Sequence, residues 1–349
     1  MAYRNVLQHP GILAALSAAL LFGAATPLAK ALLQTVNPWL LAGLLYLGSG
    51  LGLTLYRVII RAPAVLLPPA ERYGFAGAVL FGGIVGPVLL MFGLTGASAA
   101  DASLLLNAEG VFTALLAWFV FRENFDRRIA FGMIAIVAGA LVLSWPDEAS
   151  LAATWPALAI FGACLAWGLD NNLTRKVSLA DASWIASIKG LVSGVVNLVL
   201  ALALGADLPA LPTIGAAMLL GLLSYGVSLV LFVVGLRHLG TARTGAYFSV
   251  APFFGAVLAL LMGAPLTLPF TVAGLLMAFG VWLHLSEKHT HRHTHERIEH
   301  QHEHEHDEHH AHSHGDAFRP GKRHSHPHHH EPITHEHAHF PDMHHRHRH

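Results

Sequence analysis

Two short polar stretches and one lysine stand inside otherwise apolar segments, and these are the residues that could do chemistry. Glu109 lies near the middle of the apolar stretch 97–123, with Asn107 two residues before it. A carboxylate at mid-membrane depth costs on the order of 2.5 kcal/mol or more, so it normally faces a cavity or a partner instead of lipid. Because desolvation penalises its charged form, Glu109 is a candidate for proton or cation coupling. The alternative is a structural hydrogen bond between helices.

The second polar stretch is Asp170, Asn171 and Asn172, within WGLDNNLTRKV. Three consecutive polar side chains cannot all face lipid, so part of this turn must line a cavity or be unwound. Lys189 lies in the next apolar segment, about two turns from the same membrane face. It either pairs with Asp170 or extends to the lipid headgroups. Two further candidates for lining a solute site are Tyr225 and Tyr247.

The elements that must position these residues are helices that cross a membrane. Of the 349 residues, 54% are hydrophobic and 12% are charged, whereas soluble domains carry about 25% charged residues. Ten apolar segments have the length of a spanning helix, about 20 residues. Their connections are too short for an extramembrane domain. The segments are 10–33, 38–57, 73–95, 98–121, 127–146, 154–175, 183–205, 212–236, 241–263 and 266–286.

The charges and the single cysteine limit the remaining possibilities. Lysine and arginine gather in alternate connections, so the positive-inside rule predicts that both termini are cytoplasmic, which an even number of spans requires. We expect the inner (plasma) membrane of a bacterial-type cell. Cys164 alone excludes a disulfide framework and a cysteine-based metal site, and we expect it to have a packing role. No G-x-x-x-x-G-K-[ST] motif is present, so ATP is not the direct driver.

An internal repeat relates the two halves of the chain. A shift of 142 residues places ASLLLNAEGVFTALLA on TGAYFSVAPFFGAVLA without a gap. Near the start of each half the shift is 145, and there Phe22-Gly23 matches Trp167-Gly168 and Trp39 matches Trp184. An odd number of spans in each copy forces opposite orientations. The predicted fold is therefore an all-α polytopic membrane protein with ten transmembrane helices in two inverted five-helix repeats, 11–146 and 154–286.

The stretches LLLNAEGVFTALLAWFVFRE and SVAPFFGAVLALLMGAPLT resemble the paired EamA repeats of the drug/metabolite transporter superfamily, and the resemblance covers about residues 11–286. It implies a secondary transporter whose substrate pathway lies between the halves, with the fifth and tenth helices peripheral. It does not specify the substrate. The chain departs from the family pattern at Gly110, where proline is usual and Pro252 keeps it in the second copy. It departs again at Ala264, where the second repeat often has glutamate.

The tail, residues 287–349, is a different kind of sequence. Of the 27 histidines, all but His9, His238 and His284 lie in it, alternating with carboxylates. Such a composition cannot build a core and predicts disorder. Neutral imidazole suits Zn, Ni, Co and Cu, so weak and exchangeable metal binding is expected. The candidate ligands are His302, His304, His306, His309, His310, His312, His314, His328, His329 and His330.

We therefore expect a secondary transporter, not an enzyme, that exports small organic metabolites or drug-like solutes by alternating access, with a proton gradient acting through Glu109 or Asp170. The alternative is a transporter of divalent Ni, Co or Zn, with the tail as metal collector or sensor. Against this alternative, the spans carry no ligands along a metal path. We expect no required cofactor, and as partners a small solute and the lipid bilayer but no nucleic acid. The chain is either a monomer or a homodimer.

Overall fold

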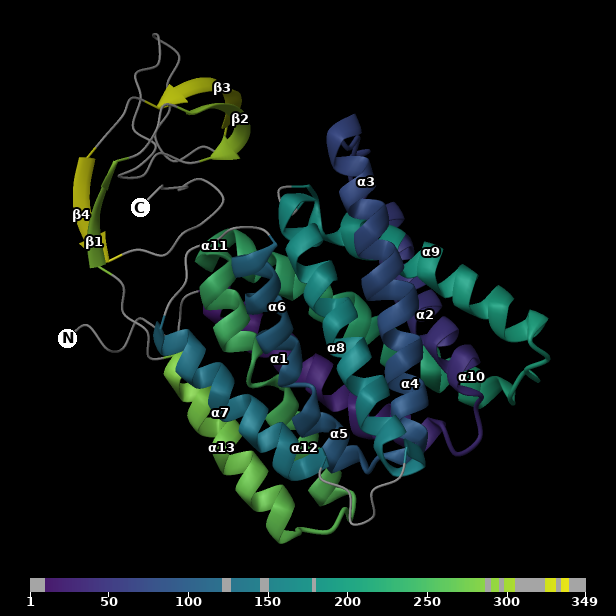
Figure 1. Ribbon diagram of the computed structural model, residues 1–349. Coiled ribbons are helices and arrows are strands. Elements are labelled where there is room, and N and C mark those ends of the chain that lie inside the picture. Colours follow the sequence, from purple (N-terminus) through teal and green to yellow (C-terminus); the bar gives the residue numbers. More distant parts are fainter. Residues whose placement is uncertain are drawn as a thin grey trace. The chain divides into compact units, whose positions relative to one another are not determined.

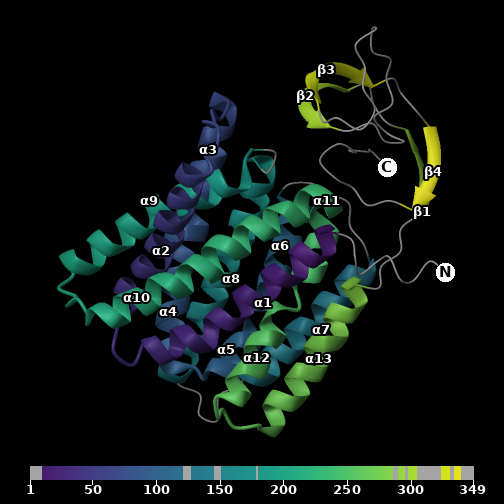
Figure 2. The ribbon, with the colours of Figure 1, turned by 180° about the vertical axis from the view of Figure 1, so that it is seen from behind.

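The computed structural model describes residues 10–120, 127–144, 151–177 and 180–285, and in the tail residues 290–294, 298–304, 324–330 and 334–338. The chain forms two compact units, Met1–Glu287 and Lys288–His349. In its described residues, the first unit is a bundle of helices (Figure 1; Figure 2). The elements are α1 (Pro10–Leu32), α2 (Pro38–Ile59), α3 (Pro69–Ala78), η3 (Val79–Val85), α4 (Gly86–Gly96), α5 (Ala99–Leu105), α6 (Ala108–Phe119), α7 (Arg127–Ser144), α8 (Leu151–Val177), α9 (Ala182–Ala203), α10 (Leu211–Gly221), η4 (Leu222–Val227), α11 (Ser228–Phe248), α12 (Ala251–Leu261) and α13 (Leu268–Leu285).

The helices confirm the predicted fold class. Six described helical segments are long and apolar enough to cross a membrane, and shorter apolar helices lie at Ala130–Val142, Ala251–Leu261 and Leu268–Leu283. Four of the predicted spans are composite. The third joins α3, η3 and α4, the fourth joins α5 and α6, the eighth joins α10, η4 and the start of α11, and the ninth joins the end of α11 and α12.

The second helix of each repeat begins with the same local arrangement. Asn37 caps α2, and its side chain accepts a hydrogen bond from the backbone N–H of Trp39 at 2.9 Å. Asp181 caps α9 in the same way by accepting from the backbone N–H of Trp184 at 2.8 Å. Such caps satisfy backbone donors that a helix leaves free at its start. The two tryptophans are the pair matched by the sequence repeat.

Both repeats also interrupt their regular helices at matched places. The segments η3 and η4 are π-helical, and a shift of 142 residues places the end of η3 on the end of η4. The fourth span is broken by a turn at Leu106 and Asn107, and the ninth by a turn at Ser249 and Val250. The internal repeat therefore extends to irregularities of the backbone.

One predicted connection is wrong. The sequence predicts that the eighth span ends at 236 and the ninth begins at 241, whereas α11 continues from Ser228 to Phe248 without interruption. The stretch between, Arg237 to Gly240, has no proline to stop the helix, and its arginine and leucine favour helix although Gly240 does not. The ninth predicted span therefore consists of the end of α11 and the whole of α12.

Close helix crossings join the two repeats. Helices α2 and α9 approach so closely that a Cβ at Gly190 would lie 2.5 Å from the nitrogen of Gly50, and a Cβ at Gly43 would lie 2.8 Å from the nitrogen of Leu198. Helix α1 packs on α12 and α8 packs on α6, so the first helix of each repeat contacts the broken span of the other. The fifth and tenth helices, α7 and α13, lie side by side (Figure 1; Figure 2).

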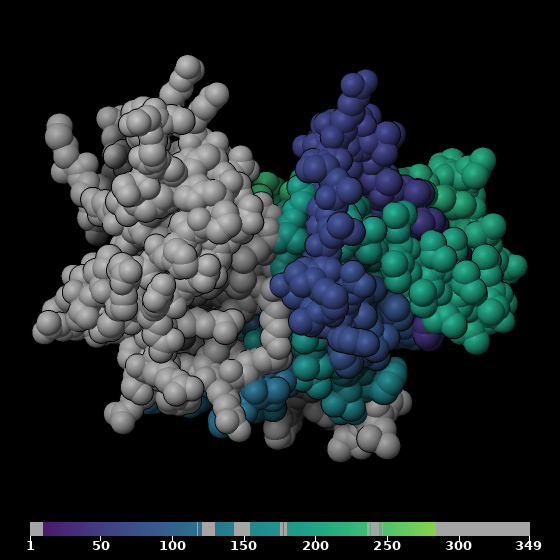
Figure 3. Space-filling model, turned by 90° about the horizontal axis from the view of Figure 1, so that it is seen from above, coloured from purple at the N-terminus to yellow at the C-terminus, as the bar shows by residue number. Residues whose placement is uncertain are grey.

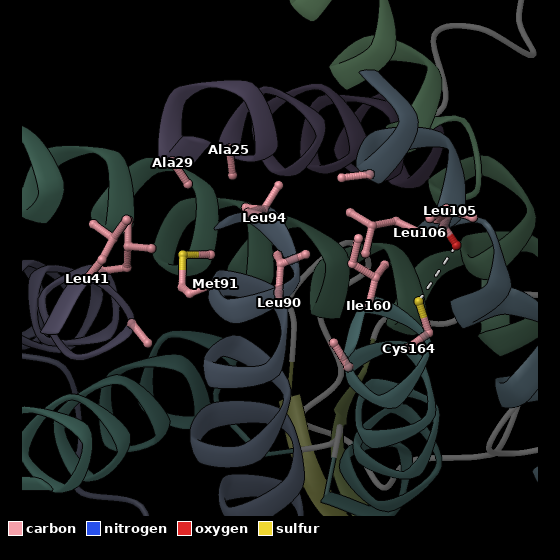
Figure 4. Packing of buried hydrophobic residues seen from close by; sticks show 14 of the residues in the cluster. Ala25, Ala29, Leu41, Leu90, Met91, Leu94, Leu105, Leu106, Ile160 and Cys164 are labelled. Atoms are coloured by element: carbon pink, nitrogen blue, oxygen red, sulfur yellow. Dashed lines mark hydrogen bonds between the residues drawn. The ribbon is translucent and has the colours of Figure 1, made fainter. Parts of the chain in front are cut away.

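The core between these helices is built from small and branched apolar residues (Figure 4). Ala25 and Ala29 of α1 and Met91 of α4 are among its fully or almost fully buried residues. Cys164 packs here as expected, and its thiol donates to the carbonyl oxygen of Leu105 over 3.8 Å. Leu105 ends α5, so this contact occupies a carbonyl next to the break of the fourth span.

A smaller apolar cluster holds α3 against α8 and α9. The ring of Phe75 stacks on that of Trp184, with centroids 5.4 Å apart. The other buried residues of the cluster are Leu67, Val79, Val177 and Ile185. In the space-filling view the blue surface of α3 and η3 lies beside the teal surface of the neighbouring helices (Figure 3).

In the second unit, four short strands pair in two antiparallel ribbons. Strand β1 (Thr290–Thr294) pairs with β4 (Thr334–Ala338), and β2 (Ile298–His304) pairs with β3 (His324–His330). A two-stranded ribbon alone is at best marginally stable in water. The disorder expected for the tail therefore stays a prediction.

The crossing of α2 and α9 gives a test of the packing. Gly190→Ala places a Cβ against the backbone of Gly50, and overpacking of this kind costs about 1–3 kcal/mol. We expect a lower thermal unfolding midpoint of the purified protein. Gly215→Ala is the matched control, since nothing lies within 4 Å of a Cβ at that position. Equal midpoints for the two variants would contradict the crossing described here.

Candidate functional site

A partly open cavity of about 60 Å³ lies between the two repeats. This volume holds a few water molecules. The first repeat contributes residues from α1, α2 and α6, and the second from α8, α9, η4 and α11. The lining residues are Phe22, Tyr46, Glu109, Trp167, Asp170, Asn171, Lys189, Ser224, Tyr225, Ser228, Leu229, Phe232 and Phe248.

Glu109 reaches the cavity from the first turn of α6, immediately after the break in the fourth span. Its Oε1 accepts a hydrogen bond from Nδ2 of Asn171 at 2.8 Å, and the same amide group lies 3.3 Å from Oγ1 of Thr113. The start of a helix favours negative charge, since free backbone N–H groups and the helix dipole point there. The break therefore places the carboxylate at a helix N-terminus inside the bundle.

Asp170 and Lys189 form a buried ion pair, with only 8% and 3% of their side chains exposed. Oδ1 of Asp170 also accepts from Oγ1 of Thr174 at 2.8 Å. The carboxylate fits because the facing residue is Gly82, where any Cβ would collide with it. Of the two roles open to Lys189, the structure shows pairing with Asp170.

The backbone of η3 holds two aromatic residues of the cavity lining in place. Pro87 has no N–H, and the N–H of Gly86 bonds to the carbonyl of Phe81, so the helix supplies no donor for the carbonyl of Gly82. Tyr46 Oη donates to that carbonyl at 2.6 Å and Trp167 Nε1 at 2.9 Å. The irregular segment thus fixes two aromatic side chains of the site.

The next carbonyl along η3, that of Gly83, is satisfied in a similar way. Asn197 of α9 donates to it through Nδ2 at 3.0 Å. On the opposite side, Ser224 of η4 and Ser228 of α11 each donate at 2.8 Å to α1 carbonyls, those of Leu21 and Ala18. Side-chain hydrogen bonds therefore tie both π-helical segments to helices of the other repeat or to the cavity wall.

Aromatic rings form a connected cluster around the cavity. Phe22 contacts Trp167 and Tyr225, each with centroids 5.8 Å apart, and Phe248 at 5.3 Å. Tyr46 contacts Tyr225 at 5.0 Å, and Phe232 contacts Phe248 at 4.8 Å. The six rings come from both repeats.

The structure brings together five of the predicted site residues and separates three. Glu109, Asp170, Asn171, Lys189 and Tyr225 line the cavity. The other three are not among its lining residues: Asn107 donates to the carbonyl of Leu104 and contacts the sulfur of Met277, Asn172 donates to carbonyls of Thr113 and Gly168, and Tyr247 packs against Ile12 and Ala15.

Sequence reasoning missed most of the aromatic lining. A signal was present for Phe22 and Trp167, because the repeat matches them to each other and each precedes a close-packed glycine, Gly23 or Gly168. Tyr46, Phe232 and Phe248 carry no comparable signal, since aromatic residues are ordinary components of apolar helices.

Five of the tail histidines expected as metal ligands lie on strands, namely His302 and His304 on β2 and His328, His329 and His330 on β3. The rest, His306, His309, His310, His312 and His314, lie outside the described residues. Within the part of the chain that the structure describes, no three histidine, cysteine, aspartate or glutamate side chains gather as a metal group.

A bundle of two five-helix repeats with polar groups converging on a cavity between them defines a membrane transporter. The sequence model of the EamA-like transporter family matches residues 9–145 and 154–286, and the chain belongs to this family. It is therefore a multi-pass membrane transporter and not an enzyme.

Two individual comparisons agree with this assignment. An uncharacterized transporter from Methanothermobacter thermautotrophicus (strain Delta H) is 27% identical over 294 residues, which cover 78% of this chain and 85% of the relative. A protein of known crystal structure aligns with a TM-score of 0.62 at 17% identity, over 78% of this chain and 94% of its own. The latter supports the fold alone.

The ion pair gives a second test. Lys189→Met removes the partner of a buried carboxylate and should destabilise the protein by about 3–5 kcal/mol, measured by thermal unfolding in detergent. Adding Asp170→Asn to Lys189→Met removes the unpaired charge and should restore most of the loss. If the Lys189→Met variant is as stable as the parent protein, the buried ion pair is ruled out.

Proposed function

We propose that the protein is a proton-coupled secondary transporter that exports small organic solutes by alternating access through this cavity. The observation that carries the proposal is Glu109, a carboxylate held at a helix break inside a cavity built by both repeats. Substrate sites of inverted-repeat transporters lie at the repeat interface, near interrupted helices.

Glu109 differs from Asp170 in its partners. Asp170 is paired with the ammonium of Lys189, whereas the described hydrogen bond to Glu109 comes from the neutral amide of Asn171. A carboxylate without an opposite charge is costly in an apolar surrounding, and taking up a proton removes that cost. Glu109 is therefore the group that exchanges a proton during the cycle, and Asp170 and Lys189 hold the wall of the site.

The size of the cavity supports alternating access. At about 60 Å³ it is too small for an organic metabolite, so helices must separate to admit one. The matched irregularities, η3 with η4 and the two broken spans, are places where the helices can bend at low cost. If the repeats are inverted, the same bend in each repeat opens opposite sides of the membrane.

The charge distribution supports one orientation of the protein. Lysine and arginine gather on the side of both termini, which by the positive-inside rule favours cytoplasmic termini, and we propose that the membrane is a bacterial-type inner membrane. Export would then carry the solute from the side with the tail to the opposite side.

Proton coupling is tested with Glu109→Gln. The amide is nearly isosteric and still accepts from Asn171, so the fold should persist, but it cannot take up a proton. In proteoliposomes loaded with a pH dye and screened with a solute library, the parent protein should move protons when its solute is added. Glu109→Gln should reduce this flux at least about tenfold, whereas the exposed control Asp207→Asn should not. Full proton flux in Glu109→Gln would contradict the coupling role.

The metal alternative is tested by removing residues 288–349. We expect solute flux in proteoliposomes to be unchanged, because the helices and the cavity belong entirely to the first unit. Cells expressing the shortened chain should also keep their tolerance and accumulation of Ni, Co and Zn. A changed accumulation of any of these metals would favour the metal-transport alternative instead.

A further inference from the structure

The charges around the cavity are not balanced. Its described lining carries two carboxylates, Glu109 and Asp170, and one ammonium, Lys189. The ammonium is joined to Asp170 in the buried ion pair, and Glu109 is bonded to an uncharged amide. With Glu109 ionised, these three groups leave one negative charge in the cavity, which a bound cation would neutralise.

Most hydrogen-bond donors of the described cavity lining are already used inside the protein, and the hydroxyl of Tyr225, which makes no described hydrogen bond, is the exception. Tyr46 and Trp167 both donate to the carbonyl of Gly82. Asn171 donates to Glu109, and Ser224 and Ser228 donate to backbone carbonyls of α1. An anionic solute would have to break most of these bonds to be held by several donors, whereas a cation finds a carboxylate of opposite charge.

The rest of the wall is aromatic. Six rings from α1, α2, α8, η4 and α11 form one contact cluster with centroid separations of 4.8 to 5.8 Å. The faces of such rings attract ammonium groups, and the attraction grows when water is excluded. Hard metal ions instead require six or more oxygen ligands, which a wall of mainly aromatic side chains does not offer.

From these observations we propose that the cavity selects organic cations, namely amines and quaternary ammonium compounds with an apolar or aromatic body. The charged nitrogen lies beside Glu109, and the apolar body lies among the six rings. This inference rests on the proposed function, since it names the class of solute that the transporter carries.

The test uses the purified full-length protein and three probes of similar shape: benzyltrimethylammonium, benzyl alcohol and benzoate. Binding is measured by titration calorimetry at neutral pH. We expect the cation to bind at least about tenfold more tightly than the alcohol, and benzoate to bind least. Equal affinities, or a preference for the alcohol or for benzoate, would overturn the proposal, as would the absence of binding by all three.

Variants separate the contribution of charge from that of the rings. Glu109→Gln should weaken binding of the cation about tenfold and leave the alcohol unchanged, while Glu109→Asp, which keeps the charge, should retain the preference. Phe248→Leu should weaken the cation more than the alcohol. The control Phe279→Leu alters an exposed ring that stacks on Trp282 and is not among the cavity residues, and it should have no effect. A cation preference that survives both Glu109→Gln and Phe248→Leu would place the cation elsewhere.

Flux measurements distinguish failure of this inference from failure of the transport function. Proton-coupled flux of neutral or anionic solutes without any flux of cations would overturn the cation preference and leave the transport function standing. An absence of flux for every solute in the library would overturn both.

Discussion

Backbone polar groups and charged side chains inside the spans need partners within the protein, because the surrounding hydrocarbon offers none. This constraint explains the structure of the cavity wall. Pro87 removes a backbone donor from the third span, and the carbonyls left without one are taken by Tyr46, Trp167 and Asn197. The same constraint joins Asp170 to Lys189. Two neighbouring carbonyls of one irregular segment thus fix side chains from three other helices.

The repeat supplies a near-symmetric frame, and the site occupies only one of its two equivalent places. Applying the shifts of the repeat, Glu109 corresponds to Ala251, Asp170 to Ala25 and Lys189 to Leu44. All three counterparts are buried apolar residues. The three charged residues of the cavity therefore have apolar, buried counterparts in the equivalent region.

The fold was predictable because its signals are long and repeated. Apolar runs of spanning length and a gap-free match between the halves survive errors of a few residues at each boundary. The site residues Glu109, Asp170 and Lys189 were predictable, because a charged side chain inside a membrane span is energetically costly and therefore needs a partner or a cavity. The site was not predictable where the rotation of a helix about its axis decides which side chains face the cavity. A turn or a π-helical segment changes that rotation for all the residues that follow it. Asn107 and Glu109 therefore face different surroundings, and Phe248 reaches the cavity where its neighbour Tyr247 does not.

Cys164 has a practical consequence of a different kind. It is the only cysteine of the chain, and it is fully buried with its thiol on the carbonyl of Leu105. Water-soluble maleimides react with accessible thiolates, which a buried thiol does not offer. The native protein should therefore react little with such reagents in a site-directed labelling experiment. A cysteine introduced at a single position would report its own exposure to each side of the membrane, without prior removal of the native thiol.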